Sequence, residues 1–320
     1  MTISNFPHGI ASMGVPILGT PSIISGDVYW VGATAGASWV AGVNAPESGQ
    51  KATPFATIDY AIGKCTANHG DVIYVLPGHT ETLATAGAIT ADVAGVSIIG
   101  LGNGTLKPQL TLSATASTIA ISAANVTIKD IEIIPGIAEI VTVFNVTGAN
   151  CTLDGIVSKT NSTYCIMTMV LTTTAANDLT IQNCHWVQTV APAANSTFIT
   201  LAGVDRFRCL NNYFDIALTN HASSAILGGT AASINCEICG NLFKIAGGAT
   251  ILSAVLLFAA STGVMAWNAC VGTAAALAGL NNPANLYCVE NYAENAVAKN
   301  GVLDPVVTSD LRLKTGVVYL

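Results

Sequence analysis

The sequence contains little charge and few aromatic side chains. Only 9% of its 320 residues are charged and 6% are aromatic, whereas 51% are hydrophobic. Ordinary soluble domains carry roughly a quarter charged residues, so much of the outer surface is expected to face partners or other copies of the chain. The 11 lysines and arginines form no basic stripe, and the net charge of the chain is −7. This charge pattern argues against a nucleic-acid ligand.

Sustained helical periodicity and a secretory signal are also missing. The first basic residue is Lys51, so the N-terminus lacks a charged region followed by an apolar one, and folding in a cytoplasm is expected. The uncharged stretch from Ile245 to Trp267 is long enough to cross a membrane. Its glycines and serines, without flanking anchors, favour a turn-rich repeat instead, so no membrane insertion is expected.

Short apolar strands separated by Asn, Gly and Thr recur from about residue 90 onward. A period in the twenties without helices is typical of a coil of three short strands that stacks on the next coil. We therefore predict an all-β fold, a right-handed parallel β-helix of about eight or nine coils. The expected inward-facing anchors, about 27 residues apart on average, are Ile128, Leu153, Ile181, Cys209, Cys239, Ala266 and Cys288.

An asparagine follows two residues after the anchor in four consecutive repeats. These residues are Asn183, Asn211, Asn241 and Asn268. Stacked amides can hydrogen-bond from coil to coil. We interpret this column as a structural ladder rather than a ligand site.

The segment Pro54-Phe-Ala-Thr-Ile-Asp-Tyr-Ala-Ile, followed by Gly70-Asp-Val-Ile-Tyr-Val-Leu-Pro-Gly-His, resembles the opening of pectin-lyase-like β-helix proteins. The resemblance implies a short helix that caps the first coil. Within residues 57–67, Ile58, Ala61 and Ile62 would cover the open core. The expected organisation is an N-terminal arm (1–25), first strands with a capping helix (26–70), the parallel β-helix (71–300) and a C-terminal tail or cap (301–320).

The first residues, Met1-Thr-Ile-Ser-Asn-Phe-Pro-His-Gly-Ile and then Gly14-Val-Pro-Ile-Leu-Gly, are similar to N-terminal arms of phage virion proteins that accompany the major capsid protein. The resemblance implies an extended arm that docks on a neighbouring protein, with a merely disordered tail as the alternative. The expected attachment residues are Phe6, Pro7, Ile10, Val15, Pro16 and Ile17.

β-helix proteins include lyases and glycosidases, so the spacing of the carboxylates bears on an enzymatic role. Glycoside hydrolysis usually needs two carboxyl groups ~5 to 9.5 Å apart, and no column of the repeat holds such a pair. Asp178 and Asp205 begin successive coils beside Arg206 and are the remaining catalytic candidates. Solvated turn residues are the simpler interpretation of both.

Other chemistry-bearing residues follow the repeat. The period of Trp186, Tyr213, Phe214 and Phe243 favours core packing over a sugar-binding surface. The nine cysteines are odd in number, which disfavours a disulfide framework, although Cys209 and Cys239 could bridge adjacent coils. The five histidines lack ligand spacing and no phosphate loop or dinucleotide fingerprint occurs. We therefore expect no metal and no cofactor.

These observations together favour a structural role. The chain is expected to be a virion surface protein of a bacteriophage, a homotrimeric capsid decoration protein attached to the major capsid protein, or to another virion protein, through its N-terminal arm. Two alternatives stay open: a tailspike-like polysaccharide depolymerase, and an adhesin that binds a host surface glycan without catalysis.

Overall fold

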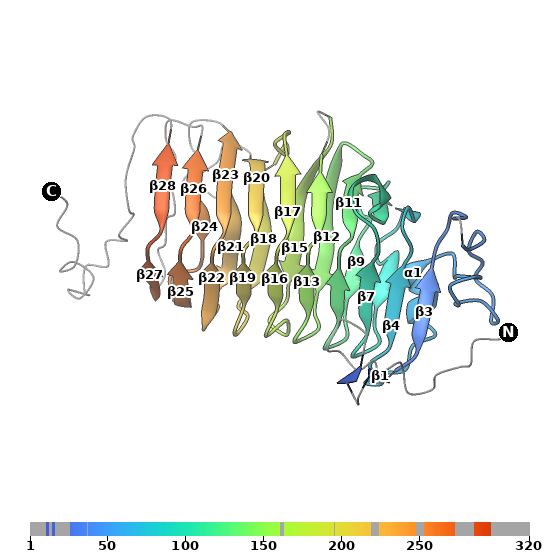
Figure 1. Cartoon of the computed structure of the whole chain (residues 1–320). Helices are drawn as coiled ribbons and strands as arrows, with labels where there is room; N and C mark the ends of the chain where they lie inside the picture. The colour runs from blue at the N-terminus through green and yellow to red at the C-terminus, as the bar shows by residue number, and fades with distance from the viewer. Residues whose placement is uncertain are drawn as a thin grey trace.

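The computed structural model describes residues 11–12, 15–16, 26–36, 38–160, 163–194, 196–218, 224–247, 253–272 and 285–295. Within these residues the fold is a parallel β-helix, or β-solenoid, in which three parallel sheets run along one axis. Figure 1 shows the coils stacked from β3 at one end to β27 and β28 at the other. Each strand pairs with the equivalent strand of the next coil, so residues about 27 apart in the sequence lie side by side.

The largest sheet has ten strands in coil order. They are β3 (Val28–Val31), β4 (Val72–Val75), β7 (Ser97–Gly100), β10 (Thr127–Lys129), β13 (Thr152–Asp154), β16 (Thr180–Gln182), β19 (Arg208–Leu210), β22 (Cys236–Cys239), β25 (Thr262–Ala266) and β27 (Asn285–Val289).

The other two sheets complete each coil. The nine-stranded sheet contains β5 (Thr80–Leu83), β8 (Gln109–Leu112), β11 (Glu132–Pro135), β14 (Val157–Lys159), β17 (His185–Gln188), β20 (Tyr213–Leu218), β23 (Leu242–Gly247), β26 (Ala269–Gly272) and β28 (Tyr292–Asn295). The seven-stranded sheet contains β6 (Ile89–Ala91), β9 (Ile119–Ile121), β12 (Glu139–Val146), β15 (Cys165–Thr172), β18 (Thr197–Ala202), β21 (Ala225–Ala231) and β24 (Ser253–Leu256).

The all-β solenoid confirms the predicted fold class, with a difference in the number of complete coils. The three sheets hold ten, nine and seven strands, so about seven turns contribute a strand to all three, fewer than the eight or nine expected. The incomplete coils lie at both ends: β3 leads into the cap α1 (Ile58–Ile62), and the coils of β25 with β26 and of β27 with β28 add no strand to the seven-stranded sheet among the described residues.

The cap closes the first coil as its apolar pattern predicts. Thr57 is the N-cap residue of α1, and its hydroxyl accepts from the Tyr60 N–H at 3.4 Å. Ile58, Ala61 and Ile62 are at most 1% exposed and join the same core as the strand residues. The helix therefore covers apolar surface that the first coil would otherwise leave open to water.

Strand pairing corrects two of the seven predicted anchors. The inward residue in register with Cys209 is Ile238, and that of the next coil is Met265. The predicted anchors Cys239 and Ala266 therefore each lie one residue after the true inward residue of their coil. Because side chains alternate between the two faces of a strand, a one-residue error moves a side chain to the other face.

The uncharged stretch that could have spanned a membrane contributes strands β23, β24 and β25 to three different sheets. Among the residues that the structure describes, no helix has the length and apolar character needed to cross a membrane.

Most of the predicted arm lies outside the described residues. Phe6, Pro7, Ile10 and Ile17 belong to that undescribed part, while Val15 and Pro16 form β2 (Val15–Pro16), which pairs antiparallel with β1 (Ala11–Ser12). Residues 301–320 also lie outside it.

Candidate functional site

Asp178 and Asp205, the two catalytic candidates, lie on adjacent coils and are bridged by Arg206. The Arg206 guanidinium contacts both oxygens of Asp178, at 2.6 and 2.7 Å, and also pairs with Asp205. Its hydrogen bond and charge hold the pKa of Asp178 below its usual value. A general acid needs a raised pKa, so this geometry describes an ion-paired turn and gives no support to catalysis at these carboxylates.

The predicted asparagine ladder exists with a different membership. The four amides that stack from coil to coil are Asn212, Asn241, Asn268 and Asn291, each at most 2% exposed. The side chains of Asn212, Asn241 and Asn268 each donate to the Oδ1 atom of the next asparagine at 2.9 or 3.0 Å. The Nδ2 atom of each of the four asparagines also donates to a backbone carbonyl of the preceding coil. Every rung is therefore satisfied in a buried position.

Asn183 and Asn211 do not belong to this ladder, which corrects the sequence prediction. They occupy the preceding position of the turn, where the backbone has a φ of 54° in both residues. Asparagine tolerates this left-handed conformation better than most side chains. The turn therefore has two adjacent positions that are rich in asparagine. Because two predicted anchors were one residue too late, the prediction assigned residues from both positions to a single column.

The four aromatic residues that follow the repeat differ in how deeply they are buried. Trp186, Phe214 and Phe243 are fully buried. Trp186 meets Phe214 edge to face with centroids 5.4 Å apart, and Phe214 stacks on Phe243 with centroids 5.0 Å apart. Tyr213 is only partly buried and packs on His185. The core interpretation therefore holds for three of the four residues, because their side chains point to the inside of the coil.

Among the described residues, none of the nine cysteines forms a disulfide. Cys209 pairs with Ile238 rather than Cys239, so the proposed bridge between Cys209 and Cys239 does not follow from the register. Burial raises the pKa of Cys209 and Cys236 to about 12. Neutral buried thiols are poor nucleophiles and poor metal ligands.

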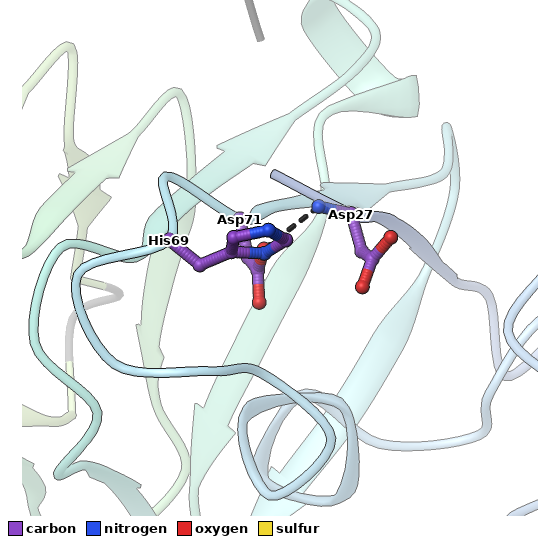
Figure 2. Close-up of side chains that lie close together, drawn as sticks. All are labelled: Asp27, His69 and Asp71. Atoms are coloured by element: carbon purple, nitrogen blue, oxygen red, sulfur yellow. Dashed lines mark hydrogen bonds and ion pairs between the residues drawn. The ribbon is translucent and has the colours of Figure 1, made fainter. Parts of the chain in front are cut away.

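Asp27, His69 and Asp71 form a cluster that sequence reasoning missed. One ligand-type atom from each lies within 4.8 Å of the others, and Figure 2 shows the His69 ring and the Asp27 backbone nitrogen directed at Asp71. Asp71 Oδ1 accepts from the Asp27 N–H and contacts His69 Nδ1, both at 2.7 Å, while Oδ2 accepts from the Thr66 N–H at 2.7 Å.

These contacts explain the charge state of Asp71. Its burial alone would raise the pKa of the carboxyl, but the hydrogen bonds from Thr66, Asp27 and His69 outweigh burial and lower that pKa. Both carboxylate oxygens are engaged by the protein itself. The arrangement therefore acts as a clamp between β3, β4 and the loop after α1, and a metal would have to displace these donors.

A hollow on the outer face of β22, β25 and β27 was also missed. It has a volume of about 1080 Å³, and we name it the C-terminal hollow. Trp267 and Tyr287 line it and are 62% and 64% exposed. Polar groups come from Asn235, Glu237 and Asn285. The outward residues Glu237, Val264 and Tyr287 align across the three strands. The misplaced anchor Ala266 hid the position of Trp267, which lies at a turn two residues after the inward Met265.

The fold and these sites define a parallel β-helix protein with a polar ladder along its inside and an aromatic hollow near its C-terminal end. No protein-family model, curated protein or solved structure matches the chain.

Proposed function

We propose that this β-helix is a structural protein of the outer surface of a bacteriophage particle, a homotrimeric head decoration protein that binds the major capsid protein through its N-terminal arm. The observation that carries the structural role is the buried asparagine ladder, because four stacked amides rigidify the rod without forming a ligand site. The assignment to a virion depends on the resemblance of the first residues to virion arms.

Three further observations support this role. The described cysteines form no disulfide, which suits folding in a reducing host cytoplasm before assembly. The ion pair of Asp178 with Arg206 favours a scaffold over a depolymerase, since it lowers the pKa of the candidate acid. The low surface charge is consistent with side-by-side packing of three copies.

The test is imaging of phage particles that lack the protein. Shells should remain closed but lose surface knobs, and addition of the purified wild-type protein should restore them. Shells that look the same with and without the protein would contradict a decoration role. Sedimentation of the purified protein should give the mass of three chains.

A truncated protein separates attachment from folding. A variant lacking residues 1–25 should keep the circular dichroism spectrum and melting temperature of the wild type, because the capped coil begins after this segment. It should fail to restore the knobs. Attachment by the truncated protein would overturn the proposed role of the arm.

A further inference from the structure

The residues of the C-terminal hollow lie in ordered rows across three strands. Asn235, Thr262 and Asn285 precede or begin β22, β25 and β27 and form a polar edge. Glu237, Val264 and Tyr287 form the next row, in register with one another. Trp267 follows β25 at the opposite edge. The three strands span roughly 10 Å, so the hollow has one polar edge and an aromatic wall.

Trp267 is an exception in its turn position. The equivalent residues two positions after each inward residue all have a positive φ, and they are Asp130, Gly155, Asn183, Asn211, Gly240, Trp267 and Glu290. Gly, Asn and Asp tolerate this conformation, whereas a bulky side chain is strained there. The φ of Trp267 is 55°. Its ring is 62% exposed and so adds little to the core.

Neither backbone preference nor core packing therefore accounts for this tryptophan. Strained residues that stability does not explain concentrate at functional sites. Its indole N–H donates to Glu290 Oε2 at 3.0 Å, which orients the ring. Tyr287, 64% exposed on the same hollow, presents a second aromatic surface to solvent.

We propose that the C-terminal hollow binds a neutral carbohydrate chain, whose sugar rings stack on Trp267 and Tyr287 and whose hydroxyls hydrogen-bond to Asn235 and Asn285. A sugar ring has an apolar face and a polar rim, which matches aromatic surfaces bordered by amides. None of the described lining residues is a lysine or arginine, and the acidic Glu237 is paired with Arg208 of the neighbouring strand at 3.4 Å. The lining residues therefore supply no positive charge that would favour an acidic polysaccharide. This binding activity goes beyond the structural role proposed above.

The concave shape favours a chain-like ligand over a second copy of the protein. Homotypic contacts between solenoids would use their uncharged flanks, whereas a hollow of about 1080 Å³ has the size of a small-molecule site. Occupation by another copy is nevertheless an outcome that the experiment below distinguishes.

The full-length protein is tested on an array of neutral and acidic oligosaccharides, and the strongest neutral binder is then titrated by calorimetry. We expect at least one neutral oligosaccharide to bind. Trp267→Asn and Tyr287→Ala should each weaken its Kd tenfold or more. The matched control is Tyr292→Ala, since Tyr292 is 55% exposed on the neighbouring sheet and does not line the hollow. Its Kd should stay within twofold.

The Trp267→Asn variant also separates a loss of binding from a loss of folding. Asparagine occupies the same turn position at Asn183 and Asn211, so this variant should melt at or above the wild-type temperature while losing the ligand. An array without any neutral binder, a preference for acidic oligosaccharides, or an unchanged Kd in Trp267→Asn would overturn the proposal. Dissociation of an oligomer by this substitution, with no sugar bound, would instead identify a contact between copies and would also overturn it.

Discussion

The side chain of Asn241 donates to Oδ1 of Asn268 in the next coil at 2.9 Å, and the same Oδ1 accepts the Asn241 backbone N–H at 3.0 Å. Both residues are at most 1% exposed. Each amide thus satisfies a side chain and a backbone group of its neighbour. Because water does not reach this position, removal of one rung leaves the adjacent donors without partners.

Asn241→Ala should destabilise the protein by about 3 kcal/mol, because it removes an acceptor for Asn212 and a donor to Cys209 and Asn268. Chemical denaturation measures the free energy of unfolding. The control is Asn285→Ala, an exposed asparagine at the start of β27, for which a change within about 0.5 kcal/mol is expected. Equal losses in both variants would contradict a stabilising ladder.

Phe214→Ala should cost about 3 to 5 kcal/mol, because the fully buried ring lies between Trp186 and Phe243 and its removal opens a cavity. Thermal and urea unfolding both report this loss. Tyr213→Ala, one residue earlier and only partly buried, should cost clearly less. A larger effect at Tyr213 would show that the aromatic stack does not support the core.

Asp71→Asn should lower stability at pH 7 and flatten its dependence on pH. The pKa of Asp71 is lowered in the folded protein, so its contribution is present above the unfolded pKa of about 3.9 and is lost as the pH falls through the folded pKa. Urea unfolding at pH 7, 5, 4 and 3 tests this. In Asp71→Asn the amide would also face the Thr66 N–H with a donor.

The comparison for this experiment is Asp92→Asn, since Asp92 is exposed. Its unfolding free energy should follow the wild-type curve at all four pH values. If Asp71→Asn also follows that curve, the clamp between β3 and β4 does not contribute to stability.

The thiols should react slowly in the folded protein. Burial raises the pKa of Cys209, Cys236 and Cys270 to about 12, so almost no thiolate forms at pH 8. Release of thionitrobenzoate from Ellman's reagent should be slow until denaturant exposes all nine cysteines. Peptide mapping should find Cys239 labelled first, because it is only partly buried, whereas burial raises the pKa of Cys65, the other partly buried thiol, to about 12. Rapid labelling of Cys209 in the folded protein would contradict this core.

Much of the architecture was predictable because a solenoid repeats one local pattern. The recurrence of apolar strands predicted parallel coils, and the resemblance to pectin-lyase-like proteins implied the cap, with which the pattern around Ile58 and Ile62 agrees. The existence of an asparagine ladder was predicted, and two of its predicted members, Asn241 and Asn268, were correct. Asn183 and Asn211 were wrong because they lie two residues after the inward Ile181 and Cys209, whereas the ladder residues lie three residues after the inward residue of their coil.

The sequence alone determined the repeat, the parallel β-helix that it forms and the capping helix, since these depend on local periodicity and on burial of apolar side chains. The tertiary structure alone decided which residues meet across coils: the bond between Asn212 and Asn241, the engagement of Asp178 by Arg206, and the exposure of Trp267 and Tyr287 on one hollow. Register is set by three-dimensional packing of neighbouring coils, and a shift of one residue exchanges the inside of the rod for its outside.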